Sequence, residues 1–194
     1  MRMIRRATLA ALGAAATMIA GCGTTPDAVF YTLNAPHPAP AGTSEVSVMV
    51  GPVTLPDVID RPQLVTAAGE NRVELHEFHR WAQPLRSEIP RVVAARLGRQ
   101  LGTANTGVSS DVAIRDPDYR VLIDVQRFEF RRGETATVDA LWTVRSRSGA
   151  ARTGHTLAEE RVADASYDAL IAAQRRALAT LSQDIAKAVQ ALQR

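Results

Sequence analysis

Among the 194 residues, 23 are lysine or arginine and 20 are aspartate or glutamate, which gives a net charge of +3. Three of the basic residues lie within the first six positions, so the chain after residue 21 carries 20 basic and 20 acidic side chains. That balance argues against the retained basic face of a nucleic-acid-binding protein. The single cysteine excludes an intrachain disulfide, so a hydrophobic core must stabilise the fold.

The N-terminus has the organisation of a bacterial secretory signal. Arg2, Arg5 and Arg6 precede an uncharged, mostly apolar run over residues 7–20, and small residues stand just before Cys22. The run is short for a transmembrane helix, which needs about 20 apolar residues. The alternative is an ordinary signal peptide followed by a free thiol, which would be a reactive liability in a secreted protein.

Residues 19–22, with the sequence Ile-Ala-Gly-Cys, resemble the lipobox of bacterial lipoproteins, whose first position is usually leucine. The resemblance implies cleavage before Cys22 and a diacylglycerol group on its sulfur. Residues 1–21 would then be a lipoprotein signal peptide and residues 22–27 a lipidated tether. Several acyl chains together hold a protein firmly to a bilayer. In the lipoproteins that this segment resembles, an aspartate after the cysteine commonly favours retention at the inner membrane, so the resemblance favours sorting to the outer membrane for a chain with Gly23 at that position.

The next part of the chain predicts short strands joined by proline-containing loops. Residues 29–33 are rich in β-formers, whereas residues 34–44 contain three prolines and predict a loop. Residues 46–50 alternate between apolar and other side chains and predict a strand that ends at the prolines that follow. Residues 63–67 and 72–78 predict a hairpin.

From Ser87 onward the apolar period changes to that of a helix. Ser87 is a suitable N-cap, and this start places Pro90 in the first turn, where no intrahelical N–H is lost. An earlier start would leave the same proline in the helix interior, at a cost of about 3 kcal/mol. We therefore predict a tight turn over residues 84–86, a helix from about Glu88 and a stop at Gly102.

Three further strands predict an antiparallel meander. Residues 119–130 alternate, but their apolar phase switches near residues 126–127, which predicts a β-bulge there. Residues 136–144 and 153–162 predict the next two strands, with a turn between them. Residues 111–114 are ambiguous and read at most as a short strand.

A long amphipathic helix over residues 167–193 is the strongest single element in the sequence. Ser166 suits its N-cap, and Asp168 complements the positive end of the helix dipole. Together these elements predict one α/β (α+β) periplasmic domain over residues 28–194, which includes the proline-rich loop 34–44. Its sheet would be mostly antiparallel or mixed, with two helices packed on one face.

Patterns that would carry catalysis or metal binding are weak. His76 and His79 lie three residues apart on a predicted strand, where we expect them to point to opposite faces rather than to share a metal. The acidic pairs in residues 159–160 and 116–118 diverge on a strand or belong to a turn. Cys22 is committed to the anchor and leaves no thiol nucleophile. We expect no enzymatic activity, no metal and no cofactor apart from the covalent lipid.

Residues 51–65 place three prolines among apolar side chains, and two interpretations remain open. The stretch is either a well-packed loop in which Asp60 and Arg61 cap or pair, or a rigid surface for another protein. The second interpretation is compatible with the prolines, because proline lowers the ordering cost of an interface loop, and the sequence does not decide between the two. The candidate interface or packing residues are Asp60, Arg61, Pro62, Gln63, Leu64, Trp81 and Pro84.

The order of several short motifs resembles PqiC-like lipoproteins, the auxiliary lipoprotein components of ABC-type or membrane-integrity transport systems. The matching features are Tyr31-Thr32-Leu33, Val50-Gly51-Pro52-Val53, Leu55-Pro56, the run from Asp60 to Val65, Trp81-Ala82-Gln83-Pro84-Leu85, the strand Tyr119–Val125 and a long C-terminal helix. Gln83 departs from the pattern, since an acid is common there. Val58-Ile59 stands where an aromatic residue is often found.

The resemblance implies a non-enzymatic subunit on the periplasmic face of the outer membrane. Such a subunit works with an MCE-domain (PqiB-like) protein that forms a lipid conduit between the two membranes, and it would dock the far end of that conduit. The resemblance also allows a homo-oligomer, and no nucleic-acid partner is expected. The alternatives are a structural envelope lipoprotein of another assembly, peptidoglycan-binding or secretion-associated, and a periplasmic hydrolase.

Overall fold

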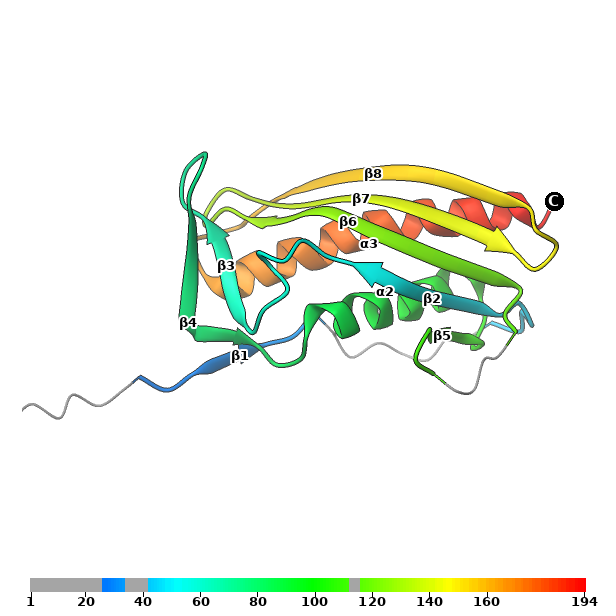
Figure 1. Cartoon of the computed structure of the whole chain (residues 1–194), viewed down its shortest axis with the longest axis horizontal. Helices are drawn as coiled ribbons and strands as arrows, with labels where there is room; N and C mark the ends of the chain where they lie inside the picture. Colours follow the sequence, from blue (N-terminus) through cyan, green and yellow to red (C-terminus); the bar gives the residue numbers. More distant parts are fainter. Residues whose placement is uncertain (1–25, 34–41, 112–115) are drawn as a thin grey trace, which may run out of the picture.

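The computed structural model describes residues 26–33, 42–111 and 116–194, which form two β-sheets and two helices (Figure 1). The elements in chain order are β1 (Val29–Tyr31), β2 (Val48–Thr54), β3 (Gln63–Ala67), β4 (Val73–Trp81), α2 (Leu85–Leu101), β5 (Thr106–Val108), β6 (Tyr119–Phe130), β7 (Thr135–Ser146), β8 (Ala151–Arg161) and α3 (Tyr167–Leu192).

The larger sheet has five strands in the order β5-β2-β6-β7-β8. β6, β7 and β8 form the predicted antiparallel meander, whereas β2 pairs in parallel with both β5 and β6. The pairing of β6 with β7 shifts between Val125 and Arg127. The bulge predicted at this point from the change of apolar phase is therefore confirmed, and it lets Val125 and Phe128 both remain buried.

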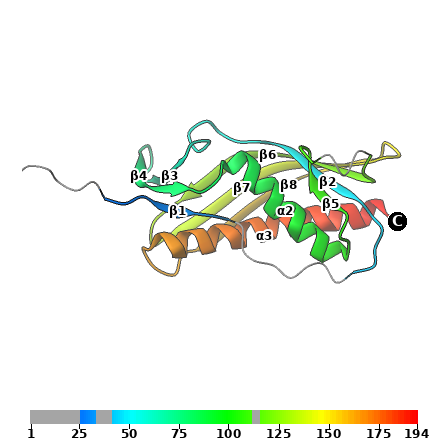
Figure 2. The same ribbon diagram turned by 90° about the horizontal axis from the view of Figure 1, so that it is seen from below.

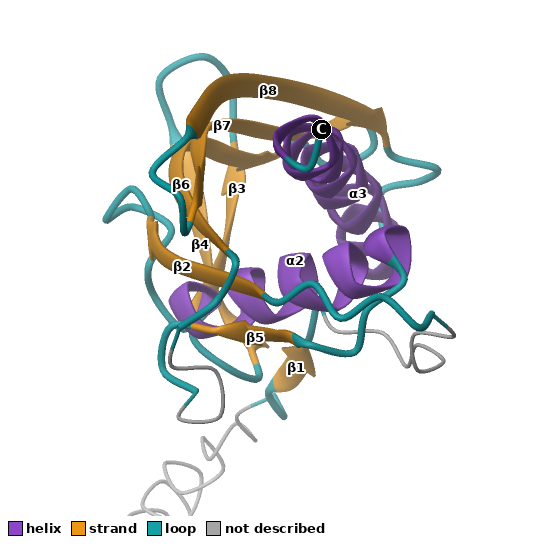
Figure 3. Cartoon of the chain, turned by 90° about the vertical axis from the view of Figure 1, so that its right-hand side faces the viewer, coloured by secondary structure: helices purple, strands orange, loops and turns teal. Residues whose placement is uncertain are grey.

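Both helices cover one face of the five-stranded sheet, as Figures 2 and 3 show. α2 packs on β2 and β5, α3 packs on β7 and β8, and the two helices contact each other. Leu178, Leu181 and Ile185 of α3 are fully buried, and the Oγ of Ser166 accepts a hydrogen bond from the Ala169 N–H. The predicted fold class and long C-terminal helix are confirmed. Neither of the two described helices is long and apolar enough to cross a membrane.

The smaller sheet has the order β1-β4-β3 and lies at the end of the molecule where the described chain begins (Figure 1). β3 and β4 form the predicted hairpin, and β1 adds to β4 as a parallel neighbour. The C-terminus lies at the opposite end of the molecule. The segment ahead of Val29 therefore enters the fold at the far end from Arg194.

Helix α2 starts earlier than the sequence analysis predicted. It begins at Leu85 with Pro84 as its N-cap residue, so Pro90 lies inside the helix and Ser87 is not the cap. The prediction was wrong because burial outweighs the lost hydrogen bond. Leu85 and Glu88 are almost completely buried, so the first turn is held by packing. The predicted stop is confirmed, since Gly102 adopts a left-handed conformation with φ of 65°.

Strand β2 also extends beyond its predicted end. It continues through Gly51 and Pro52 to Thr54, and its register with β6 shifts between Val50 and Val53. This irregularity accommodates a proline that would otherwise end the strand. β5 was not predicted, and the ambiguous strand over residues 111–114 falls largely outside the described residues, as does most of the proline-rich loop 34–44.

Candidate functional site

The connection between β2 and β3 and the turn between β4 and α2 meet beside β1 and enclose a cleft of about 250 Å³. The Trp81 N–H donates to the Pro62 carbonyl at 2.7 Å, and the Ala82 N–H donates to the Tyr31 carbonyl at 2.8 Å. Three segments that are distant in sequence are thus joined by backbone hydrogen bonds. The cleft is lined by Asp60, Arg61, Pro62, Trp81, Ala82, Gln83 and Pro84.

The cleft rests directly on the hydrophobic core. Trp81 is 5% exposed, and its ring centroid lies 6.0 Å from that of Phe130 on β6. Pro62, Gln83 and Pro84 are exposed at the rim. Because the prolines fix their φ angles and Trp81 is held by packing, the rim is positioned before any partner binds.

The two arginines at the cleft, Arg86 and Arg61, differ in whether they have a partner. Arg86 Nε donates to Asp60 Oδ2 at 3.0 Å, and this hydrogen bond, together with the Asp60 charge, raises the pKa of Arg86 above its ordinary value. Arg61 differs, because its buried Nε has no hydrogen-bond partner within the described part of the chain. A donor that is buried without a partner costs free energy.

Most of the residues singled out in the sequence come together here, but not all of them. Asp60, Arg61, Pro62, Trp81 and Pro84 line the cleft. Leu64 instead lies in the core at 2% exposure, and the amide of Gln63 donates to Glu77 at 3.2 Å on the surface. Cys22 lies outside the described residues.

A second cluster, which the sequence analysis missed, joins β1, β4 and α3. The hydroxyl of Tyr31 lies 2.9 Å from His79 Nδ1, and the hydroxyl of Tyr167 lies 2.9 Å from His76 Nδ1. The His79 ring stacks on Tyr167 with 3.8 Å between ring centroids. The Arg132 guanidinium lies 4.7 Å from the centroid of the same Tyr167 ring. The cluster therefore ties the first strand to the start of the C-terminal helix.

The prediction that His76 and His79 point to opposite faces was wrong. Leu64 pairs with His76, but the preceding Gln63 pairs with Arg80, so three residues of β4 between these pairs lack a partner in β3. This bulge turns both histidines toward Tyr167, with 6.3 Å between their ring centroids. An isolated strand would have alternated strictly, and only the partner strand imposes the shift.

The cluster is built as a packed polar junction. Burial lowers the pKa of His76 below its ordinary value, and the positive charge of Arg132 and the neighbouring His79 lower it further, while Glu74 acts in the opposite direction. Burial raises the pKa of Tyr31. Within the described residues, no group of three or more histidine, cysteine, aspartate or glutamate side chains is arranged to hold a metal ion.

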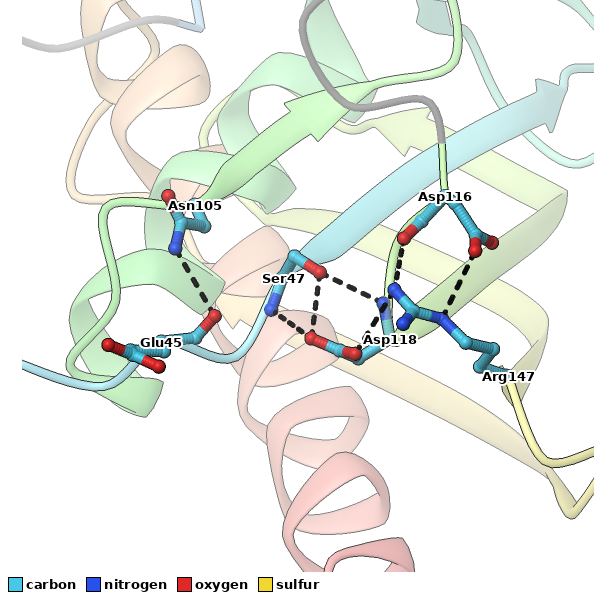
Figure 4. Close-up of polar contacts among 6 residues, drawn as sticks. All are labelled: Glu45, Ser47, Asn105, Asp116, Asp118 and Arg147. Atoms are coloured by element: carbon cyan, nitrogen blue, oxygen red, sulfur yellow. Dashed lines mark hydrogen bonds and ion pairs between the residues drawn. The ribbon is translucent and has the colours of Figure 1, made fainter.

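The acidic pair Asp116 and Asp118 forms hydrogen bonds and ion pairs that hold neighbouring segments of the fold together (Figure 4). Asp118 Oδ2 accepts hydrogen bonds from the Ser47 N–H at 2.9 Å and from its hydroxyl at 2.8 Å. Arg147 forms ion pairs with Asp118 at 3.3 Å and with Asp116 at 3.4 Å. The hydrogen bonds from Ser47 lower the pKa of Asp118, with a smaller contribution from Arg147. These groups fasten the start of β2 to β6 and to the β7–β8 turn.

Comparison with protein families gives a match that includes both the cleft and the cluster around Tyr167. The model of the family described as ABC-type transport auxiliary lipoprotein component matches residues 31–186. The chain belongs to this family. The PqiC-like resemblance drawn from the ordered motifs is thus confirmed at the level of the family. No curated protein gives a match.

Solved structures share the fold of this auxiliary lipoprotein at low sequence identity. An uncharacterized protein superposes with a TM-score of 0.70 at 19% identity, covering 84% of this chain and 99% of the other. A Xanthomonas campestris protein of the DUF330 family gives a TM-score of 0.55 at 18% identity, covering 81% of this chain and 92% of the other. At this identity the likeness establishes the fold alone.

The matched region of the auxiliary lipoprotein begins within β1 and ends within α3. It therefore contains the whole cleft and the Tyr31–Tyr167 junction. The family is a class of transport components rather than a class of enzymes. The cleft presents a preformed rim, and Arg61 beside it has a buried Nε without a hydrogen-bond partner among the described residues.

Proposed function

We propose that this chain is an outer-membrane-anchored periplasmic lipoprotein that serves as a non-enzymatic accessory subunit of an MCE-type (Pqi-like) intermembrane lipid transport system. It docks the lipid conduit at the outer membrane. The family match over residues 31–186 carries the proposal, because it assigns the chain to a class of transport auxiliary lipoproteins. The MCE-domain partner and the outer membrane are what the PqiC-like motifs and the lipobox at residues 19–22 imply.

The anchor in this proposal is a covalent lipid on Cys22, and the fold is compatible with it. Six residues separate Cys22 from Val29, the first residue of β1. β1 lies at one end of the molecule (Figure 1). A lipid at this position would hold that end toward the bilayer and leave the far end, with the C-terminus, directed into the periplasm.

The contact with the MCE-domain protein is proposed to use the cleft between Asp60 and Pro84. Its rim is held in place by proline and by backbone hydrogen bonds, which reduces the entropy lost on binding. Arg61 would donate to a backbone carbonyl or an acidic side chain of the partner. Trp81 supports the rim from below, so its role is to position the cleft rather than to touch the partner.

Co-purification tests the partnership. Membranes solubilised in mild detergent should yield an MCE-domain protein together with the wild-type chain. Gln83→Arg adds a bulky charge at the exposed rim and should reduce the recovery several-fold, and Arg61→Ala should do the same by removing the donor. Arg152→Ala, an exposed change on β8, is the matched control and should leave recovery unchanged. If no MCE-domain protein accompanies the wild-type chain, the proposed partnership is wrong.

The anchor has its own test. Cys22→Ala should leave an unlipidated precursor that retains residues 1–21, whereas the wild type should begin at an acylated Cys22. Intact-mass spectrometry of both proteins from membranes distinguishes these forms. A wild-type chain with a free sulfhydryl, or with its leader intact, would contradict the anchor without bearing on the MCE-domain contact.

A further inference from the structure

The outer face of the small sheet exposes two phenylalanine side chains that are not part of the hydrophobic core. Phe30 on β1 is 62% exposed and Phe78 on β4 is 39% exposed. Tyr31 and Trp81, which are register partners, face the body of the molecule, where Trp81 is buried. Phe30 precedes Tyr31 and therefore points outward, together with its own register partner Arg80.

These three residues, Phe30, Phe78 and Arg80, are called the aromatic face below. Phe78 and Arg80 flank His79 in β4. Because the His79 ring stacks on Tyr167, the side chains of its two flanking residues lie on the side away from Tyr167. Arg80 Nε is buried and has no hydrogen-bond partner among residues 26–33, 42–111 and 116–194. The aromatic face thus combines two exposed apolar rings with a half-buried arginine.

The position of the aromatic face relative to Cys22 points to what covers it. Eight peptide steps separate Cys22 from Phe30, and a fully extended chain covers at most about 3.6 Å per residue, so the two lie within about 29 Å of each other. If Cys22 carries the lipid, as proposed above, the aromatic face is always held close to the bilayer surface. Its chemistry also fits that location, because aromatic rings and snorkelling arginines concentrate at membrane interfaces.

We infer that the aromatic face rests in the interface of an anionic phospholipid bilayer. The Phe30 and Phe78 rings enter the boundary between headgroups and acyl chains, and Arg80 donates to lipid phosphate oxygens. This inference rests on the proposed lipid anchor. It adds that the folded domain itself touches the membrane and that the contact fixes the tilt of the domain, which a lipid on a short tether alone does not do.

A site-specific label tests the contact in the full lipidated chain. An acylated Cys22 has no free thiol, so Phe78→Cys introduces a single reactive site for an environment-sensitive fluorophore. In vesicles of phosphatidylethanolamine and phosphatidylglycerol, nitroxides on the upper acyl chain should quench this label several-fold more than a label at Leu157→Cys. Leu157 is the matched control because it is 55% exposed and lies on β8, the edge strand of the five-stranded sheet.

A second variant connects the quenching to the proposed residues. Adding Phe30→Ser to the Phe78→Cys chain should reduce the quenching, while far-ultraviolet circular dichroism stays unchanged. Equal quenching of the labels at positions 78 and 157 would overturn the inference. So would a spectral shift at position 78 that grows with protein density but is insensitive to nitroxide, since a second copy of the chain would then cover the face.

Acylation is measured by mass spectrometry on the same samples before the fluorescence is read. Missing acyl chains would refute the proposed anchor. Acylated protein without nitroxide quenching at position 78 would refute only the membrane contact. The two failures are therefore distinguishable within one experiment.

Discussion

Glu88 is a carboxylate that the fold has almost completely removed from water. Its exposed fraction is 2%, and its Oε1 accepts a hydrogen bond from the Leu33 N–H at 2.9 Å and another from the Thr32 hydroxyl. Burying such a group is costly unless its acceptors are used. Here the two hydrogen bonds connect the first turn of α2 to the segment that follows β1.

Glu88→Ala should therefore be strongly destabilising. It removes both hydrogen bonds and leaves the Leu33 N–H buried without its acceptor, which should lower the free energy of unfolding by about 2–3 kcal/mol. Urea titration followed by circular dichroism measures the loss. Glu70→Ala, in the exposed β3–β4 turn, is the control and should stay within about 0.5 kcal/mol of the wild type. Equal effects of the two changes would contradict the role of Glu88.

Gly154 is required by a neighbouring side chain rather than by its backbone conformation. A Cβ at this position would lie 2.2 Å from the ring of Trp142, its register partner on β7. The Trp142 Nε1–H donates to Thr156 at 3.0 Å, and the Thr156 hydroxyl donates to Asp184 of α3 at 3.0 Å. The absence of a side chain at Gly154 thus lets the sheet and the helix share a polar link.

Gly154→Ala should displace the Trp142 ring and break this link. Overpacking of this kind costs about 1–3 kcal/mol, so the variant should unfold at lower temperature and show altered tryptophan emission. Thr153→Ala, the exposed neighbouring position, controls for a general effect on β8. A Gly154→Ala variant with wild-type stability and emission would show that the ring is free to move aside.

At the level of the elements, local patterns predicted most of the fold. The meander β6–β8, its bulge and α3 follow from alternation, phase change and helical period in the sequence, because each is buried on one face by its own neighbours. The start of α2 and the end of β2 were misjudged for one reason. Both contain proline, whose local cost is known from the sequence, whereas the burial that offsets it depends on tertiary packing.

The start of α2 can be tested with a matched pair of serines. Ser166→Ala removes the N-cap hydrogen bond of α3 and should cost about 1 kcal/mol. Ser87→Ala should cost little, because Ser87 is an exposed residue within α2 rather than its cap. Thermal unfolding of both variants separates these expectations. A loss with Ser87→Ala as large as that with Ser166→Ala would instead place the start of α2 near Glu88.

The two sites differ in how far the sequence reveals them. All seven cleft residues stand in two short motifs, and five of them were selected from the order of those motifs along the chain, although the order could not show that the motifs meet. The junction of Tyr31, His76, His79 and Tyr167 could not be predicted. Its formation depends on the bulge in β4, which is set by pairing with β3 and leaves no mark on the alternation of β4 itself.

On the scale of the whole molecule, this junction connects four parts of the fold. It joins β1, β4, the start of α3 and the β6–β7 turn, from which Arg132 also donates to the Ala165 carbonyl at 3.0 Å. The small sheet is held to the helical layer at this point. The protonation state of His76 therefore bears on how firmly the small sheet is attached.

Acidification should loosen this attachment. The pKa of His76 is lowered in the folded state, so below about pH 6.5 the unfolded chain binds more protons than the folded one, and stability falls as pH decreases. We expect the free energy of unfolding to decrease between about pH 7.5 and pH 5.5, and to decrease less in His76→Gln. The groups facing His76 are Glu74, His79, Arg132 and Tyr167. Urea unfolding across this range measures the difference.

His155→Gln provides the control for this pH dependence, because His155 is exposed and pairs with Asp139 of the neighbouring strand β7 rather than with any residue around Tyr167. It should follow the wild-type curve more closely than His76→Gln does. Identical pH profiles of the wild type and His76→Gln would show that His76 does not govern the response.

Tension on the chain ahead of Val29 is carried by the parallel pairing of β1 with β4. The three register pairs, Val29 with His79, Phe30 with Arg80 and Tyr31 with Trp81, lie side by side along the pulling direction of the strand. A load along the strand axis strains them together, whereas a load that peels a strand away breaks one bond at a time. A load that enters through this segment along the strand axis would therefore act on the three pairs in shear, with the Tyr31–His79 contact as a further link.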